Sequence, residues 1–289
     1  MQATSILHAQ AALGEGALWN LQTQQLYWVD IEGRVLHIFD PATGHDTSFP
    51  TQERVGTVVP TRDGNALVAL QTGIHRLDTT TGQLTLLTNP LTEPSLRFND
   101  GKCDPAGRFW VGTFDLLERP HAGTFYRFDP NGSLHVMLRH ITNSNGLAWS
   151  LDRTTMYYID TPTLAVQAFD YDQATGSIAN PRVVIRFPAG AGWPDGMTLD
   201  AEGKLWVALW GGGTVRRYDP DTGALLQAIE VAAPNTSSCA FGGPELKTLF
   251  VTTARGGLTP EQLQQFPLSG NLFAVEPGVQ GVPAYFFEG

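Results

Sequence analysis

The sequence predicts an all-β protein, a six-bladed β-propeller, on three observations. Six similar units follow one another, and the starts of successive units are 41 to 49 residues apart. Within each unit, short apolar runs alternate with turn sequences, and no long stretch keeps apolar residues at helical spacing. A period of roughly 40–50 residues with several short strands per unit is typical of propeller blades.

Each unit opens with an apolar, strand-like run. These runs begin at Leu26, Leu67, Phe109, Met156, Leu205 and Leu249. Most units continue with a short connector, an aromatic-containing strand and a turn such as DPATG at 40–44 or DPDTG at 219–223. Asp, Pro and Gly mark turns because they supply local side-chain caps, a fixed φ and tolerance of positive φ. Residues 215–219 alternate with a period near two, as a strand does.

The ends of the chain and one short segment depart from this pattern. Thr259 followed by Pro260 predicts a short helix over residues 259–265 of the sixth unit. We expect residues 4–9 to pair with the last blade and close the ring. Two β-sandwich domains are the alternative, but no linker or charge block divides the chain. We therefore predict a single propeller domain over residues 1–289. A parallel α/β fold is excluded because crossover helices are missing.

Composition narrows the possible partners. The net charge of −10 and the pI near 5.1 disfavour nucleic-acid binding, which needs a basic face. No apolar stretch approaches the roughly 20 residues of a membrane span, and the N-terminus has no basic region followed by an apolar core. We expect a cytoplasmic protein without nucleic-acid or membrane partners. No heptad or long apolar stripe indicates assembly, so we expect a monomer or weak dimer.

Several common catalytic patterns are missing. Cys103 and Cys239 lie far apart without metal or redox spacing, so we expect two buried, reduced cysteines. The seven histidines form no HExxH pattern, and no GxSxG occurs. The glycines at 211–213 precede no helix and predict a tight connector, not a phosphate-binding loop.

Four polar residues occupy one matching place in successive units, four residues before an apolar residue that leads into a turn. They are Glu15, Asn99, Asn145 and Asp195, which precede Trp19, Cys103, Trp149 and Leu199. Equivalent positions of circularly arranged repeats face a common axis, so we expect these side chains to converge. Gly56 beside Thr57 holds the place in the second unit, and Ser237 or Ser238 holds it in the sixth.

Each of these residues, taken alone, also fits a turn or an exposed loop, as Asn145-Gly146 and Asp195-Gly196 illustrate. A match in four of six units favours a shared site. Glu, Asn and Asp oxygens suit a hard divalent cation. Such an ion polarises carbonyl groups and lowers the pKa of water, and both effects favour hydrolysis of an activated acyl group such as a lactone.

Arg97 lies two residues before Asn99 and projects towards the same face by the strand period. It could bind substrate hydroxyls or stabilise an oxyanion, and a surface salt bridge is the alternative. Trp193 and Trp210 could stack on a sugar ring or, alternatively, pack in the propeller core. The connector over residues 115–122 is the expected specificity loop, because loops on a rigid scaffold vary freely.

Four blocks, in this order, closely resemble the gluconolactonase/regucalcin (senescence marker protein) family. They are LGEGALW, LRFNDGKCDPAGRFWVGT, NSNGLAWSLD and PDGMTLDAEGKLWVALW, and the resemblance extends from about residue 11 to 276. The C-terminal block from Pro234 to Arg255 looks most like the bacterial sugar lactonases, such as xylonolactonases and arabinonolactonases.

The resemblance implies a propeller with one divalent metal ion at the mouth of the axis. The family's metal ligands fall on Glu15, Asn145 and Asp195, and its substrate- and water-contacting residues fall on Arg97 and Asn99. Asp195 also matches the family's candidate general base, a role that competes with ligation for the same oxygens.

The family also has an acidic residue that contacts sugar hydroxyls from the connector of the third unit. Here Glu118 is the candidate and Asp115 its rival, because this connector departs from the family in length and composition.

The resemblance thus predicts metal-dependent hydrolysis of an aldono-1,4- or 1,5-lactone to the aldonic acid, with Asp195 and Asn99 as catalytic residues. The partner is a small-molecule sugar lactone. Calcium, zinc, manganese and ferrous iron all remain open. The alternatives are a non-enzymatic calcium-binding regulatory propeller and a propeller hydrolase of other esters or lactones. Arg97 and Asn99 favour an enzyme, because a calcium site alone does not need them.

Overall fold

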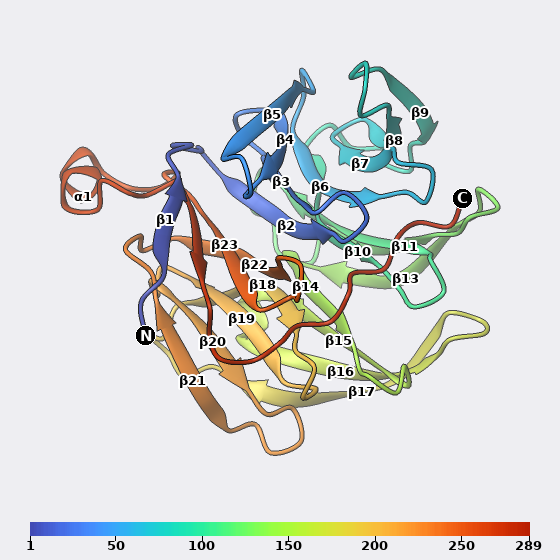
Figure 1. The fold of residues 1–289 in the computed structure, drawn as a ribbon. Coiled ribbons are helices and arrows are strands. Elements are labelled where there is room, and N and C mark those ends of the chain that lie inside the picture. The colour runs from blue at the N-terminus through green and yellow to red at the C-terminus, as the bar shows by residue number, and fades with distance from the viewer.

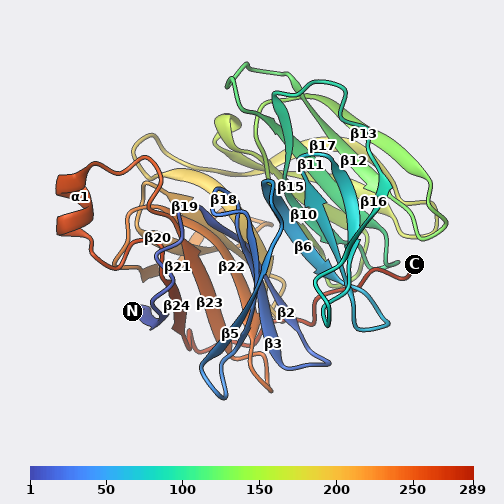
Figure 2. The same ribbon diagram turned by 90° about the horizontal axis from the view of Figure 1, so that it is seen from above.

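The computed structural model describes residues 1–289 as six four-stranded antiparallel sheets around a central axis, which confirms the six-bladed β-propeller (Figure 1). In Figure 1 the first strand of each sheet lies near the centre and the last strand lies at the periphery. Figure 2 shows the ring from the side, with the single α-helix projecting away from the sheets.

We number the blades in chain order. Blade 1 contains β2 (Gly14–Asn20), β3 (Gln25–Asp30), β4 (Val35–Asp40) and β5 (His45–Pro50). Blade 2 contains β6 (Val55–Pro60), β7 (Ala66–Leu70), β8 (Gly73–Leu77) and β9 (Leu84–Thr88). Blade 3 contains β10 (Leu96–Cys103), β11 (Phe109–Asp115), β12 (Gly123–Phe128) and β13 (Leu134–Ile141).

The second half of the ring repeats this order. Blade 4 contains β14 (Ser144–Trp149), β15 (Thr155–Asp160), the 3-10 turn η1 (Thr161–Thr163), β16 (Ala165–Asp172) and β17 (Ser177–Arg186). Blade 5 contains β18 (Trp193–Leu199), β19 (Leu205–Trp210), β20 (Thr214–Tyr218) and β21 (Leu225–Glu230). Blade 6 contains β22 (Thr236–Gly242), β23 (Thr248–Thr253), β24 (Leu272–Val275) and β1 (Thr4–Leu7).

The two ends of the chain meet in blade 6. Strand β1 pairs antiparallel with β24, with Thr4 opposite Ala274, which confirms the predicted ring closure. The C-terminal tail then crosses one face of the ring (Figure 1). Gly281 N donates to Leu246 O in blade 6, and Phe287 N donates to Pro60 O in blade 2. The tail therefore links blade 6 to blade 2, the blades on either side of blade 1.

The apolar core consists of six clusters, each between two neighbouring blades. Tyr158 of blade 4 packs with Trp110 and Phe125 of blade 3, for example. Every sheet therefore buries both faces. This arrangement explains why ALVAL of β7 is continuously apolar, with all five residues buried, instead of strictly alternating.

Two smaller predictions are also confirmed. Helix α1 (Pro260–Gln265) begins after Thr259, whose side chain accepts from Gln262 N in a capping box. Cys103 and Cys239 are buried and unbridged. Their burial raises the pKa of both thiols, that of Cys239 to about 12. None of the helices is long and apolar enough to cross a membrane.

Candidate active site

The innermost strands of the six blades run side by side around the axis, and each carries a β-bulge near its first residues. In β2 the register shifts after Glu15, in β14 after Asn145, and in β18 after Pro194. A bulge places residues outside the regular ladder and re-aims their side chains. We call this end of the axis the polar mouth, defined by Glu15, Arg97, Asn99, Asn145 and Asp195.

Glycines allow the inner strands to approach one another closely here. A Cβ atom on Gly146 would lie 2.7 Å from Asp195 O, and one on Gly196 would lie 2.5 Å from Ser238 Oγ. Both glycines lie within strands. The interpretation of Asn145-Gly146 and Asp195-Gly196 as turns is therefore wrong: these glycines make room for the neighbouring strand.

Arg97, Asn99 and Asn145 form a continuous chain of hydrogen bonds from blade 3 to blade 4. Arg97 Nη1 donates to Asn99 Oδ1 at 2.5 Å, and Asn99 Nδ2 donates to Asn145 Oδ1 at 2.8 Å. Asn99 Nδ2 also donates to Ser144 O at 2.7 Å. All three side chains are buried. The alternative of a surface salt bridge for Arg97 is therefore wrong.

Thr161 continues the chain to blade 5 and fixes the orientation of Asn145. Thr161 Oγ1 donates to Pro194 O at 2.8 Å and accepts from Asn145 Nδ2 at 2.7 Å. A hydroxyl has a single proton to donate. Because that proton goes to Pro194 O, the amide of Asn145 must present its NH₂ group to Thr161, and Oδ1 is left facing Asn99.

Three buried carboxylates repel one another at the polar mouth. Glu15, Asp100 and Asp195 are 7%, 4% and 6% exposed. Burial, reinforced by the Asp100 carboxylate, raises the pKa of Glu15 to about 8. Burial and the Glu15 carboxylate raise the pKa of Asp195 well above its usual value. Negative charge without enough positive charge is the dominant electrostatic feature of this region.

The polar mouth has the donor atoms that a divalent cation requires. Asp195 Oδ1 and Asp100 Oδ2 are buried and accept no hydrogen bond. Asn145 Oδ1 accepts from Asn99 and keeps a second lone pair. Carboxylate and amide oxygens suit hard cations, and a cation would offset the repulsion between Glu15 and Asp195. No three His, Cys, Asp or Glu side chains form a metal-binding group; the candidate set has two carboxylates and one amide.

The sequence pattern missed Asp100, Asn143 and Thr161. Asp100 follows Asn99 within the same bulge. Only a prediction that included this bulge would have placed both side chains at the axis, because neighbouring residues of a regular strand point to opposite faces. Asn143, whose Oδ1 accepts from Asn99 Nδ2 at 3.1 Å, precedes Asn145 by two residues, the same spacing that identified Arg97. Thr161 lies in a 3-10 turn outside the repeat pattern, and nothing in the sequence singles it out.

The connector after β11 separates the two acidic candidates. Glu118 is exposed, has a φ of 54° and makes no side-chain hydrogen bond or ion pair with the polar mouth. Asp115 is buried and forms an ion pair with Arg119, whose guanidinium lowers the pKa of Asp115. Asp115 also accepts from Leu117 N at 3.2 Å. Asp115 is therefore engaged within the loop.

The two tryptophans lie opposite each other at the start of β18. Trp193 pairs with Trp210 across the ladder, two residues from Asp195. Trp193 is 49% exposed, so packing in the core is the wrong interpretation for this residue, whereas Trp210 is half-buried. An exposed indole beside the polar mouth offers an apolar face to a ligand.

Fold and site together define a class: a six-bladed propeller with buried carboxylates, amides and an arginine at one mouth of its axis. Residues 13–255 match the family model described as "SMP-30/Gluconolactonase/LRE-like region". The chain belongs to this family, which confirms the resemblance.

Relatives match the chain over nearly its whole length. It is 38% identical over 287 residues to the "Putative sugar lactone lactonase YvrE" of Bacillus subtilis, covering 98% of each chain. It is also 38% identical over 290 residues to regucalcin of Danio rerio, covering 98% of this chain and 97% of that one. These equal identities do not separate the bacterial lactonases from the regucalcins.

A solved structure is similarly close. A calcium-binding protein, regucalcin, from Agrobacterium tumefaciens superposes with a TM-score of 0.94 at 30% identity, covering 99% of this chain and 97% of that one.

Proposed function

We propose that the protein hydrolyses a sugar lactone, an aldono-1,4- or 1,5-lactone, to the corresponding aldonic acid, with one divalent metal ion held by Glu15, Asn145 and Asp195. The named activity of the Bacillus relative supports the reaction class. The buried oxygen donors without protein partners support the metal ion. When bound, such an ion acts as a Lewis acid and lowers the pKa of water.

The chain's own residues account for the proton transfers. Asp195, whose Oδ1 has no hydrogen-bond donor, is the base that accepts a proton from the attacking water. Water adds to the lactone carbonyl carbon, the bond from that carbon to the ring oxygen breaks, and the ring oxygen takes the proton held by Asp195 to become a hydroxyl. Ligation of the metal ion by Asp195 competes with this role for the same oxygens.

Arg97 stabilises the charge that develops on the carbonyl oxygen. Its Nη1 donates to Asn99 Oδ1 and Phe98 O, whereas its buried Nε has no acceptor. Burial lowers the pKa of Arg97 to about 10, so the guanidinium remains charged near neutral pH. A buried cation with an unused N–H is suited to an oxyanion.

This arginine is the observation that carries the proposal. A site that only held calcium would be weakened by a guanidinium beside its ligands, because like charges repel. A site that turns over an ester needs such a donor. Asn99 fixes the guanidinium and links it to Asn145, so we assign Arg97 and Asn99 to substrate and water contacts.

Residues around the polar mouth would set substrate preference. The exposed face of Trp193 can stack against the C–H face of a sugar ring. Glu118 lies on the exposed loop over residues 115–122, where a ligand could reach it. We assign both to recognition of the sugar, and Trp210 supports Trp193 from the neighbouring strand.

A proton-release assay with a panel of aldonolactones tests this proposal. Purified protein is treated with a chelator, and calcium, zinc, manganese or ferrous iron is then added back singly, with spontaneous hydrolysis subtracted. Turnover restored by a metal on a pentono- or hexonolactone supports the proposal. Tight calcium binding without turnover of any lactone would favour the non-enzymatic alternative. That alternative is considered because the similar Agrobacterium structure is described as a calcium-binding protein.

A further inference from the structure

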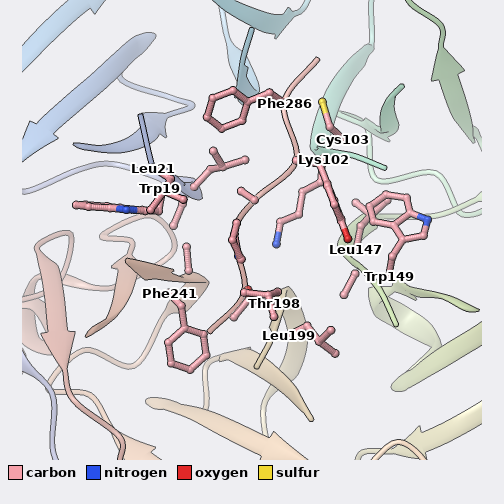
Figure 3. A pocket seen from close by; sticks show the side chains of 18 of the residues that line it. Trp19, Leu21, Lys102, Cys103, Leu147, Trp149, Thr198, Leu199, Phe241 and Phe286 are labelled. Atoms are coloured by element: carbon pink, nitrogen blue, oxygen red, sulfur yellow. The ribbon is translucent and has the colours of Figure 1, made fainter. Parts of the chain in front are cut away.

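A large pocket lies at the opposite end of the axis from the polar mouth (Figure 3). Its volume is about 680 Å³, within the range of roughly 300–1,000 Å³ typical of small-molecule sites. The last residues of several inner strands and the C-terminal tail at 282–286 line it. We call this end the apolar mouth, because 16 of its 23 lining residues are hydrophobic.

The charged residues of this pocket are all cations. Arg62, Lys102 and Arg153 line it, and no Asp or Glu does. The chain as a whole carries a net charge of −10. A positively charged, apolar-walled pocket in an acidic protein concentrates its field on an anion, because low-dielectric walls focus field lines.

Lys102 is the cation nearest the centre of the pocket. It extends from β10 towards the middle of the space in Figure 3. Its ammonium group donates to one protein acceptor, Met197 O. An ammonium carries three N–H donors. Two of them therefore remain for a ligand, and a carboxylate or sulfonate can accept both.

The two arginines are held at the rim. Arg62 pairs with Glu288 at 2.7 Å, and its guanidinium lies 5.4 Å from the ring centre of Phe286. The Arg153 guanidinium lies 6.0 Å from the ring centre of Tyr285 and forms no ion pair within the chain. Arg153 therefore keeps a positive charge at the entrance, whereas Glu288 offsets the charge of Arg62.

Aromatic walls surround the lysine. Trp19, Trp149 and Phe241 come from blades 1, 4 and 6, and Phe286 of the tail closes one side (Figure 3). Such walls bind the apolar body of a ligand through burial of surface and ring contacts. A sugar lactone is a poor fit here, because it has neither a negative charge nor a large apolar surface.

We propose that the apolar mouth binds an amphipathic organic anion, with its carboxylate or sulfonate on Lys102 and its apolar body between the aromatic walls. The site shares no residue with the polar mouth. Burial raises the pKa of Asp100, and the charge of Lys102 partly offsets this rise, but binding to the apolar mouth can be measured without any turnover.

Fluorescence titration with 8-anilinonaphthalene-1-sulfonate on the full-length protein tests the pocket. We expect one saturable site per chain. Octanoate should displace the probe at concentrations at least about tenfold lower than 1-octanol does, because only octanoate makes a charge-assisted contact with Lys102. No saturable probe binding, or equal displacement by the acid and the alcohol, would overturn the proposal.

Variants locate the site. Lys102→Met should weaken probe binding at least about tenfold. Lys247→Met is the matched control, since it removes an exposed lysine paired with Glu245, and it should leave binding unchanged. Unaltered binding by Lys102→Met contradicts the proposal.

Ala148→Phe keeps the lysine but fills the pocket, because Ala148 is part of its lining. If circular dichroism shows that Lys102→Met fails to fold, this variant tests whether the probe binds in the pocket. Loss of probe binding supports the proposal, and full binding overturns it.

Discussion

The two mouths of the axis are built from the same strands, yet their chemistry is opposite. Strand β14 passes from Asn145 at the polar mouth to Trp149 at the apolar mouth, and β18 passes from Asp195 to Leu199. At the polar mouth, buried oxygens lack donors and carboxylates repel. At the apolar mouth, the side chains pack into clusters between blades. Four residues along one strand therefore separate the proposed lactonase site from the packed clusters between blades.

This contrast predicts which substitutions affect which property. Changes at the polar mouth should remove metal binding or turnover and leave the fold almost intact, because the buried carboxylates there gain little from their surroundings. Changes to packed residues at the opposite end should lower stability and leave chemistry nearly unchanged.

The largest expected effect is that of Asp195→Ala. It should lower lactone turnover more than about 10³-fold and abolish stoichiometric metal binding, because it removes a charged ligand and the base together. The melting temperature should change little. Elemental analysis and the proton-release assay measure both outcomes. Retention of one metal ion per chain in this variant refutes the assignment, and Asp221→Ala, at an exposed Asp of blade 5, is the control.

Arg97→Ala should separate chemistry from metal binding. We expect kcat/KM to fall about 10²–10³-fold, the usual consequence of losing an oxyanion donor, while metal content stays at the wild-type level. Steady-state kinetics with elemental analysis provide the test. Wild-type turnover by this variant would contradict the role of Arg97 in stabilising the oxyanion. Arg186→Ala, which removes an exposed arginine without an ion pair, should have no effect.

Leu199→Ala tests the other end of the strand that carries Asp195. Leu199 is 4% exposed within a cluster between blades 4 and 5. Its truncation should lower the free energy of unfolding by about 3 kcal/mol, roughly a hundredfold in the folded-to-unfolded ratio. Turnover by the folded fraction should stay within a few fold. Chemical denaturation measures the first quantity, and the exposed Leu226→Ala serves as the comparison.

Thr161→Val should have the smallest effect, through the orientation of Asn145. Without the hydroxyl, Asn145 Nδ2 loses its acceptor and the amide is no longer fixed. We expect metal affinity to fall about tenfold, as is common for residues that orient a ligand. Calorimetric titration measures the affinity. Thr163→Val changes an exposed threonine of the same turn and should leave it unaltered; equal effects of both substitutions would discount the orienting role.

The fold was predictable from sequence because the strand pattern of one blade recurs along the chain, together with its turn sequences. The same repetition placed Glu15, Asn99, Asn145 and Asp195 at matching positions of the inner strands, where the structure brings them to one mouth. The pairing of residues 4–7 with the last blade followed from the need to close the ring.

Features that break the repeat were not predictable. The bulge that turns Asp100 towards the axis cannot be predicted from the sequence, because Asn-Asp-Gly is equally typical of a turn. Thr161 acts from a 3-10 turn between strands. The pocket around Lys102 is assembled from separate blades and completed by the C-terminal tail, so no local pattern indicates it.

The most direct test of the central claim is a titration of chelated protein with a single metal while aldonolactone turnover is followed by proton release. The account predicts that turnover rises from the spontaneous rate and saturates at one ion per chain. It also predicts no rise with Asp195→Ala. Full turnover in the chelated protein, or saturation of metal binding without turnover, would contradict the assignment of the polar mouth as a metal-dependent lactonase site.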